Sequence, residues 1–302
     1  MIQIKGTVKK FGDFTALGGL WCDIPSGTVW GLVGINGSGK STLLRTMTGI
    51  YMPDGGSVEY DGESVFDNPE IKGKISFVPD DLYLPPRACL NDMVKKYKLL
   101  KRSFNEKKFR ELIAIFGLDA RARFNTFSKG MRRQAATALA IAEENPYIFF
   151  DETFDGLDPF KRSFLKRVMK DEAHQNGVTV IITSHSLREL EDICDSLAIL
   201  DKGGFVLDSE TESIKTPAVK LQVAFADDYD ESRFAGLELV SYTRKGRVAE
   251  IIVRGVESEI IPTVEALSPI LLEPLPLTLE EIFSYNLDGR KIVKEDSRNE
   301  EA

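Results

Sequence analysis

The sequence contains few cysteines and no long apolar run. Its three cysteines, Cys22, Cys89 and Cys194, lie far apart and lack any paired metal-ligand spacing. We therefore interpret them as reduced core residues of a cytosolic protein. No segment approaches the length needed to cross a bilayer, and the first residues do not resemble a signal peptide. These features argue against a disulfide-stapled secreted domain and against a chain that spans a membrane itself.

The overall composition is that of a soluble globular protein. Of the 302 residues, 42% are apolar and 28% are charged, so the chain can bury a full core and form more than one folding unit. Its charge is uneven. Residues 1–204 carry 28 basic and 27 acidic side chains, whereas residues 205–302 carry 11 and 20. The acidic C-terminal part would repel phosphates, so we expect no nucleic-acid partner.

The most informative segment is Gly34–Ser41, which has the P-loop form G-x-x-x-x-G-K-[ST]. An apolar run at 28–33 precedes it as a predicted strand, and 41–48 follows as a predicted helix. This context directs backbone N–H groups and a helix N-terminus toward one anion. Lys40 then supplies a positive charge to the outer phosphates, and the Ser41 hydroxyl can ligate Mg²⁺.

Two acidic residues follow a second apolar strand. Residues 147–150 are a continuous apolar run that ends at Asp151 and Glu152. In a P-loop protein, a carboxylate at this place lies beside the magnesium ion. Adjacent carboxylates at a strand end point in different directions. We therefore predict that Asp151 holds the metal and that Glu152 polarises an attacking water.

A histidine closes a third apolar strand. His185 ends the run at 181–185 and can donate to the γ-phosphate or to the attacking water. Taken alone, a histidine at a strand end is more often a packed or capping residue. Its place after a buried strand, in a chain with a P-loop, makes it a candidate.

The order of predicted elements indicates an α/β core with a helical insertion. The apolar runs at 147–150 and 178–182 are typical of a parallel sheet buried on both faces. Strands at 2–10 and 15–24 predict an antiparallel β edge. Between about 86 and 145 the pattern becomes helical. Residues 186–195 are predicted to form a further helix.

A second region follows this α/β core. We predict a first domain at 1–208, a polar linker at 209–219, and a small α+β domain with a charged tail at 220–302. Predicted strands at 221–226 and 248–253 flank a charged hairpin, and 257–267 is a predicted helix.

Together these motifs resemble the nucleotide-binding subunit of an ABC transporter, and residues 1–204 cover its whole ATPase unit. Phe11 matches the aromatic that stacks on adenine. The segment Phe127–Met131 stands at the signature, usually Leu-Ser-Gly-Gly-Gln, and Asp155–Asp158 matches the D-loop. Asp151 with Glu152 matches Walker B and the catalytic glutamate, and His185 matches the switch histidine. The resemblance implies a P-loop ABC-ATPase core with a mostly parallel sheet, an antiparallel β edge and an α-helical subdomain.

The resemblance also assigns residues to the nucleotide. Ser128 precedes the helix that begins near Gly130, so its hydroxyl and the free N–H groups form an anion site. The family implies that Ser128 and Gly130 meet the γ-phosphate of the other subunit, so that two copies enclose two ATP molecules. Arg132 and Arg133, in the first turn of that helix, are expected to face solvent. The expected ATP-binding residues are Phe11, Gly34, Ile35, Asn36, Gly37, Ser38, Gly39, Lys40, Ser41, Thr42, Ser128, Gly130 and Asp158.

Three residues depart from the family pattern. Lys129 replaces a signature glycine and Met131 replaces the signature glutamine. Asp80 stands where the family has its Q-loop glutamine, and it is shorter, charged and acceptor-only. We expect Asp80 to contact Mg²⁺ or its water, with the neighbouring Asp81 as the alternative. The predicted metal residues are Ser41, Asp80 and Asp151. The predicted catalytic residues are Glu152, His185 and Lys40.

The implied function is ATP hydrolysis that drives a separate membrane permease. The expected partners are ATP, a second ABC ATPase subunit and the permease, and the expected location is the cytoplasmic face of the cell membrane. The segment 279–283 resembles the C-terminal extension of exporter ATPases of the multidrug, antibiotic or lantibiotic type. That similarity is short.

An alternative from a different class is a soluble ABC ATPase without a permease. Members that act on chromosomes carry long coiled coils, for which this chain has no room, and translation-factor members carry two ATPase units. A cytosolic iron–sulfur cluster assembly ATPase stays open on the sequence alone. A degenerate regulatory subunit would not need an intact Lys40, Asp151 and Glu152.

Overall fold

The chain folds into two units, and the first unit is built around a helix that lies between two sheets. The computed structural model describes residues 1–101, 103–210, 218–275 and 281. The chain divides into two units, Met1–Glu210 and Thr211–Ala302. Within the described ranges, no helix combines the length and the apolar character needed to cross a bilayer.

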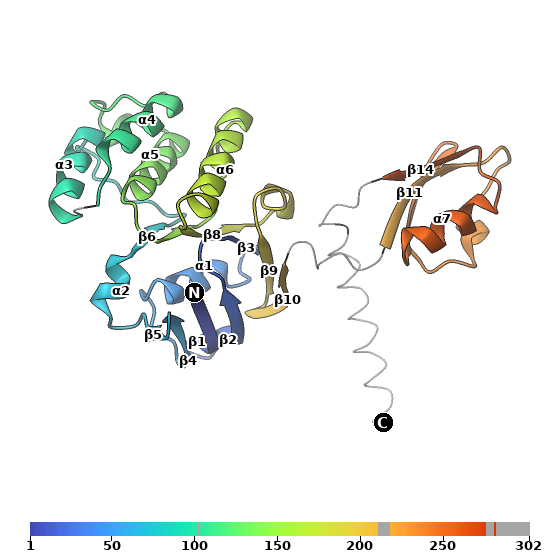
Figure 1. The fold of residues 1–302 in the computed structure, drawn as a ribbon, viewed down its shortest axis with the longest axis horizontal. Helices are drawn as coiled ribbons and strands as arrows, with labels where there is room; N and C mark the ends of the chain where they lie inside the picture. Colours follow the sequence, from blue (N-terminus) through green and yellow to red (C-terminus); the bar gives the residue numbers. More distant parts are fainter. Residues whose placement is uncertain (102, 211–217, 276–280, 282–302) are drawn as a thin grey trace. The chain divides into compact units, whose positions relative to one another are not determined.

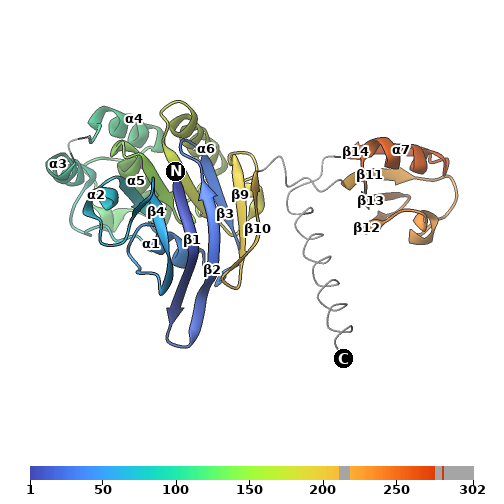
Figure 2. The ribbon, with the colours of Figure 1, turned by 60° about the horizontal axis from the view of Figure 1, so that its bottom comes forward.

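The first sheet of unit one is antiparallel and has the order β2-β1-β4-β5. In β1, Ile2 pairs with Ile24 of β2 on one side and with Tyr60 of β4 on the other. Figure 2 shows β1 and β2 as a long hairpin. This sheet is the predicted antiparallel edge. Its strands are β1 (Ile2–Phe11), β2 (Phe14–Ile24), β4 (Gly55–Tyr60) and β5 (Glu63–Ser64).

The second sheet has the order β10-β9-β3-β8-β7-β6, and only β10 runs antiparallel to its neighbour. Every residue of β3, β7 and β8 is buried, as expected for parallel strands covered on both faces. The strands are β3 (Val29–Val33), β6 (Ile75–Val78), β7 (Tyr147–Phe150), β8 (Thr179–Ser184), β9 (Ser196–Asp201) and β10 (Gly204–Glu210).

Helix α1 (Lys40–Met47) lies between the two sheets, as Figure 1 shows. Its buried Leu43, Leu44 and Met47 belong to one apolar cluster with side chains of both sheets, among them Leu17 and Phe149. This burial holds the helix in place directly behind the P-loop. The start of α1 is therefore fixed relative to the carboxyl ends of the parallel strands.

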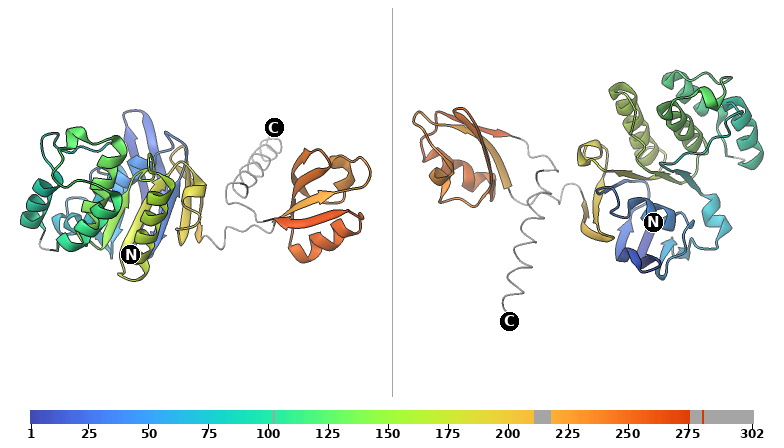
Figure 3. Two further views of the ribbon diagram at one scale, coloured as in Figure 1. Left: turned by 90° about the horizontal axis from the view of Figure 1, so that it is seen from above. Right: turned by 180° about the vertical axis from the view of Figure 1, so that it is seen from behind.

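Helices α3, α4, α5 and α6 lie on the other face of the parallel sheet, whereas the buried Ile71 of α2 belongs to the apolar cluster around α1. Figures 1 and 3 show α3, α4 and α5 grouped together, with α6 beside them. Asn105 accepts a hydrogen bond from the Lys108 N–H and caps α4, and Gly117 ends it at a φ of 70°. The helices are α2 (Pro69–Gly73), α3 (Leu90–Leu100), α4 (Glu106–Phe116), α5 (Lys129–Ala142) and α6 (Pro159–His174), with a 3₁₀ turn η1 (Phe124–Thr126).

The predicted helix at 186–195 is wrong. Only the 3₁₀ turn η2 (Leu187–Glu189) forms there. Leu190 and Ile193 are almost completely buried, and the Asp195 N–H donates to the Val29 carbonyl. The segment folds inward in tight turns so that it can enter β9 beside β3.

Unit two is a four-stranded antiparallel sheet in the order β12-β13-β11-β14. Helix α7 (Glu257–Glu265) packs onto it, and Phe225, Phe234 and Ile251 are among its buried core residues. The strands are β11 (Ala218–Ala224), β12 (Leu239–Lys245), β13 (Val248–Arg254) and β14 (Leu271–Leu275), with a 3₁₀ turn η3 (Glu231–Phe234).

Parts of two predictions fall outside the described residues. Of the predicted linker 209–219, residues 209 and 210 end β10 and residues 218 and 219 begin β11, while 211–217 lie outside the described ranges. Of the exporter-like segment 279–283, only Glu281 is described.

Candidate active site

The predicted site residues meet at the carboxyl ends of neighbouring strands. The P-loop follows β3, His185 follows β8, Asp151 and Glu152 follow β7, and Asp80 lies two residues beyond β6. Because β3, β8, β7 and β6 are consecutive in the parallel sheet, these loops emerge at one edge. This edge is where open α/β sheets bind their ligands.

Glycines let the P-loop backbone fold tightly around the start of α1. Gly39 is the N-cap of that helix and has a φ of 111°, which side chains of L-residues rarely allow. A Cβ on Gly34 would lie 2.4 Å from the Ser38 hydroxyl and 2.5 Å from the Leu200 carbonyl oxygen. The loop can therefore wrap closely around the N-terminus of α1, whose first N–H groups have no partner within the helix.

A cavity of about 690 Å³ lies in front of this helix end. Seven of the predicted nucleotide-binding residues line it, as do Glu152 and Asp80. The lining residues are Phe11, Phe14, Thr15, Ala16, Asn36, Gly37, Gly39, Lys40, Ser41, Thr42, Asp80, Glu152, Lys202 and Gly203. Predicted residues Gly34, Ile35 and Ser38 belong to the same loop but do not line this cavity.

Lys40 folds back onto its own loop and onto Glu152. Its ammonium group donates to the carbonyl oxygens of Gly34 at 2.6 Å and Ile35 at 3.3 Å. It also lies 3.1 Å from Oε1 of Glu152, as an ion pair rather than an aligned hydrogen bond. Both side chains are mostly buried, with 5% of Lys40 and 11% of Glu152 exposed. The P-loop ammonium is thus held within reach of the cavity by a carboxylate.

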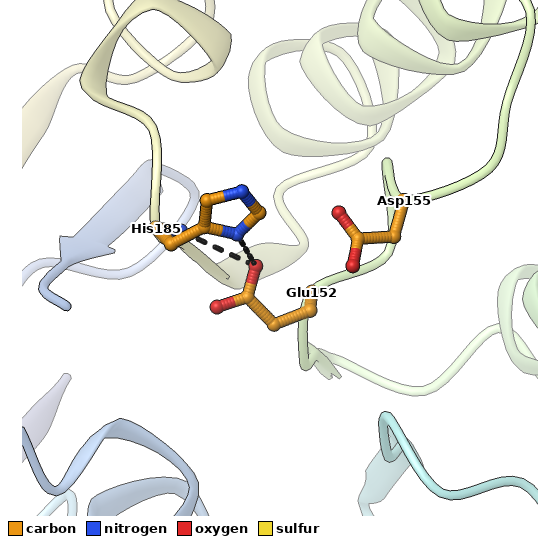
Figure 4. Close-up of side chains that lie close together, drawn as sticks. All are labelled: Glu152, Asp155 and His185. Carbon is orange, nitrogen blue, oxygen red and sulfur yellow. Dashed lines mark hydrogen bonds and ion pairs between the residues drawn. The ribbon is translucent and has the colours of Figure 1, made fainter. Parts of the chain in front are cut away.

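Glu152 also contacts His185 (Figure 4). Its Oε2 lies 2.9 Å from Nδ1 of His185 and accepts the His185 backbone N–H at 3.2 Å. The hydrogen bond that Glu152 accepts from His185 raises the pKa of His185 above its ordinary value of 6.5, and the nearby Asp155 carboxylate raises this pKa further. Ligand atoms of Glu152, Asp155 and His185 all lie within 4.8 Å of one another. The predicted water-polarising pair is therefore in contact.

Asp151 is completely buried next to Glu152. The Thr183 hydroxyl donates to its Oδ1 at 2.8 Å and accepts the Glu152 backbone N–H at 3.0 Å. The other oxygen, Oδ2, is buried and has no hydrogen-bond partner among the described residues. A buried carboxylate oxygen without a hydrogen bond lowers the stability of the folded protein unless a further group binds it. Its chemistry fits a hard cation or the water bound to one.

Three predicted nucleotide-binding residues outside the P-loop, Ser128, Gly130 and Asp158, also do not line the cavity. Ser128 caps α5 by accepting the Met131 N–H at 3.2 Å, and Asp158 caps α6 by accepting the Lys161 N–H at 3.0 Å. A Cβ on Gly130 would lie 2.9 Å from the Gly156 carbonyl oxygen, so the start of α5 abuts the segment Asp155–Asp158. Within one chain, these residues form a second group, apart from the P-loop cavity.

The expectation that Arg133 faces solvent is wrong, because its side chain is only 1% exposed. Its guanidinium donates to the Glu152 carbonyl oxygen at 2.5 Å and to the Asp80 carbonyl oxygen at 3.1 Å, and it pairs with the Asp80 carboxylate. Asp80 therefore has a cationic partner that the sequence analysis did not foresee. Arg132 is partly buried, and its Nε donates to the Phe124 carbonyl oxygen.

Sequence reasoning missed several residues of the cavity wall. Phe14 pairs with Phe11 across the β1–β2 hairpin, and Ala16 continues the same strand. Lys202 and Gly203 form the turn between β9 and β10, and the Gly203 N–H donates to the Ser38 carbonyl oxygen at 2.9 Å. The Lys-Gly turn is visible in the sequence, but its approach to the P-loop depends on strand order.

The fold and this cavity define a P-loop nucleotide-binding protein. A family model described as ABC transporter matches residues 17–155. An uncharacterized ABC transporter ATP-binding protein, YhaQ of Bacillus subtilis, is 30% identical over 239 residues, covering 78% of this chain and 79% of YhaQ. The daunorubicin/doxorubicin resistance ATP-binding protein DrrA of Streptomyces peucetius is 30% identical over 224 residues, covering 71% of this chain and 67% of DrrA.

A solved structure shares the fold. It is described as a dimeric post-hydrolysis state of the ATP-binding cassette MJ0796 bound to ADP and Pi. The TM-score is 0.63 at 23% identity, over 70% of this chain and 99% of the other. The chain belongs to the ABC transporter family and is one of its ATP-binding, ATP-hydrolysing subunits. The predicted fold class is confirmed.

Proposed function

We propose that this protein hydrolyses ATP in a two-subunit sandwich and thereby drives a separate membrane permease. The observation that carries the proposal is the double contact of Glu152, which meets the P-loop ammonium of Lys40 on one oxygen and His185 on the other. A carboxylate in this position lies between the phosphate-binding loop and a histidine. That is the arrangement needed to activate water beside a bound phosphate.

Phosphate binding requires Lys40 to change partners. The P-loop N–H groups and the start of α1 offer a preformed anion site. When the γ-phosphate enters, Lys40 moves from Glu152 to the phosphate oxygens and stabilises their charge. Glu152 then has one oxygen released to accept a proton from water, while His185 orients the water or donates to the phosphate. The ion pair with Lys40 thus keeps the base engaged until ATP is bound.

We assign magnesium to Ser41 and Asp151. The unsatisfied buried oxygen of Asp151 fits a metal or its water shell, and Ser41 lines the cavity at the first turn of α1. When bound, the ion would neutralise charge on the phosphate oxygens. Asp80 lines the same cavity, but its carboxylate is already paired with Arg133, so a metal there would compete with a buried guanidinium. We therefore do not assign Asp80 to the metal.

The cavity wall made by the β1–β2 hairpin suits the adenine base. Phe11 is half-exposed at the cavity and meets Tyr51 edge-on, with ring centroids 5.5 Å apart. Phe14 stands across the hairpin from it. Aromatic faces bind bases by stacking without reading their hydrogen-bonding edges.

We propose that a second subunit completes the site. Ser128, Gly130 and Asp158 do not line their own chain's cavity, yet Ser128 heads a 14-residue helix whose N-terminus suits an anion. In a symmetric dimer each cavity would be capped by the partner subunit. MJ0796, which shares the fold, is described as a dimer bound to ADP and Pi, and we extend that assembly to this chain.

A membrane permease is the partner that converts dimer closure into transport. We propose that it docks on the cytoplasmic face, near Asp80 and the helices that follow. The two units are proposed to act as an ATPase domain at 1–208, with its helical subdomain at about 86–145, and a C-terminal domain at 220–302 joined through 209–219. No observation on this chain favours iron–sulfur assembly.

Two measurements test the proposal. Purified protein should hydrolyse ATP only with Mg²⁺, and Lys40→Ala should abolish turnover without altering the melting temperature by more than a few degrees. From detergent-solubilised membranes, the tagged chain should retain an integral membrane protein after washing. If the tagged chain retains no membrane protein, the transport role fails, whereas magnesium-independent turnover would remove the assigned metal.

A further inference from the structure

One buried guanidinium connects two loops of the active site, the loop after β6 and the loop after β7. Arg133 lies in the second turn of α5, and its Nη1 donates to the carbonyl oxygens of Glu152 at 2.5 Å and Asp155 at 3.4 Å. Its Nη2 donates to the carbonyl oxygen of Asp80 at 3.1 Å and pairs with the Asp80 carboxylate. A guanidinium presents several donors in a rigid planar fork, which suits contacts with several acceptors at once.

The backbone of Glu152 needs such support. Its φ is 49°, in the left-handed region that residues with a side chain adopt only when their surroundings enforce it. The Thr183 hydroxyl accepts its N–H, and Arg133 together with the Asp155 N–H donates to its carbonyl oxygen. The direction of the Glu152 carboxylate follows from this backbone conformation. Arg133 therefore helps to set where the water-activating group points.

Asp80 is the counter-charge that keeps Arg133 in place. A guanidinium that is 1% exposed is costly to bury without an anion, and Asp80 is the carboxylate whose contact with it is shortest. Lys129 also lies 3.9 Å from the same Asp80 oxygen. Asp80 and Lys129 both depart from the family pattern, and here they lie together around one buried arginine.

We propose that Arg133 is a positioning residue for Glu152 and that Asp80 acts by anchoring Arg133 rather than by binding magnesium. The proposal rests on ATP hydrolysis by the function proposed above. The proposal gives a physical reason for an aspartate where the family pattern has a glutamine, because a neutral glutamine would supply no charge to the buried guanidinium. It also links the loop after β6 to the catalytic carboxylate, since both contact the same side chain of α5.

Kinetics of matched variants test the proposal. We expect Arg133→Gln to lower kcat at least roughly tenfold while the KM for ATP stays within about threefold, because Lys40 and the P-loop are untouched. Arg133→Lys keeps the positive charge but has one donor nitrogen instead of three. Its kcat should therefore lie between that of the parent and that of Arg133→Gln. Arg132→Gln is the control, because Arg132 lies on the same helix but donates to Phe124 instead. Its kcat should stay within about twofold of the parent.

Asp80→Asn tests the anchor separately. Because it leaves the buried Arg133 guanidinium without its counter-charge, the melting temperature is measured alongside kcat, and the assay is run well below it. We expect kcat to fall about three- to tenfold, with no change in the Mg²⁺ concentration that gives half-maximal rate. Combined with Arg133→Gln, it should add less than about twofold, because both substitutions act through one contact. Arg133→Gln should still form ATP-dependent dimers on gel filtration, since Ser128 and the P-loop are intact.

Several outcomes would overturn the proposal. These are a kcat for Arg133→Gln within twofold of the parent, equal losses for Arg133→Gln and Arg132→Gln, or fully additive losses in the double variant. A roughly tenfold higher Mg²⁺ requirement in Asp80→Asn would instead make Asp80 a metal ligand. If the parent chain does not hydrolyse ATP, the proposed function fails before any variant is compared.

Discussion

Replacing Glu152 by glutamine should separate two effects of one carboxylate. The substitution keeps the size and one acceptor oxygen but removes the negative charge. In the structure that charge meets Lys40 at 3.1 Å and His185 at 2.9 Å. We therefore expect the variant to lose its water-activating base and, at the same time, to release Lys40 from its ion pair.

The two effects have different sizes. Loss of a positioned general base lowers kcat about 10²- to 10⁴-fold. For this ion pair we take about 1 kcal/mol, the upper end of the range for exposed pairs, because its two side chains are mostly buried but are not aligned as a hydrogen bond. Lys40 must leave this pair to reach the phosphate. Its absence should therefore tighten ATP binding by about 1 kcal/mol, or about fivefold in Kd.

Single-turnover hydrolysis and calorimetric titration with ATP measure the two effects on the same protein. Lys40→Ala is the control, because it removes the same ion pair from the other side and should weaken ATP binding. An unchanged kcat in Glu152→Gln would remove Glu152 from its role. Weaker ATP binding in that variant would show that the Lys40–Glu152 pair does not compete with the phosphate.

Three further predictions follow from individual contacts. His185 has a raised pKa, so its contribution to stability is complete below about pH 6.5 and is lost as the pH rises through the folded-state pKa. Melting temperatures between pH 6 and 8 should therefore show a decline that Glu152→Gln flattens, and an identical slope in both proteins would contradict the contact. Phe11→Ala should weaken ATP binding about tenfold through lost stacking. Trp21→Ala, which removes a more exposed aromatic side chain outside the cavity, should leave binding unchanged, and equal losses in the two variants would exclude a base site at Phe11. Phe234 is 1% exposed among three aromatic rings, so Phe234→Ala should cost unit two about 3–5 kcal/mol of unfolding free energy. ATP turnover should persist in that variant at temperatures where protease digestion shows unit two to be open, and its loss there would mean that the first unit depends on the second.

Local sequence determines the parts of the site that were predicted well. The P-loop, Asp151 with Glu152, and His185 each follow a buried apolar run, and each needs only a strand, a turn and a few fixed residue types. The parallel sheet then brings them to one edge because its strands are neighbours. Such motifs can be read from consecutive residues, since the geometry that they require is local.

The contacts of Arg133 could not be predicted in this way. Its partners Asp80 and Glu152 lie 53 and 19 residues away along the chain. Ala135, Ala138 and Leu139 recur at helical spacing and predict one buried face of α5, with Arg133 on the opposite side of the helix. In the structure the helix packs against β6 and β7 as well as α4, so nearly all of its circumference is buried. Only the tertiary packing shows that the face of α5 that carries Arg133 is also covered.

The composite site is the central claim, and mixed subunits test it most directly. Two proteins are made, both carrying Glu152→Gln. In the first, Lys40→Ala removes the P-loop ammonium that binds phosphate. In the second, Ser128→Arg blocks the N-terminus of α5. Neither protein should form ATP-dependent dimers alone, because each self-pairing damages both sites. Their mixture retains one site with an intact Lys40 and an intact partner Ser128. Native mass spectrometry with Mg-ATP should detect this mixed dimer. If no mixed dimer forms, or if Ser128→Arg dimerises with itself as well as its parent does, the sandwich is contradicted.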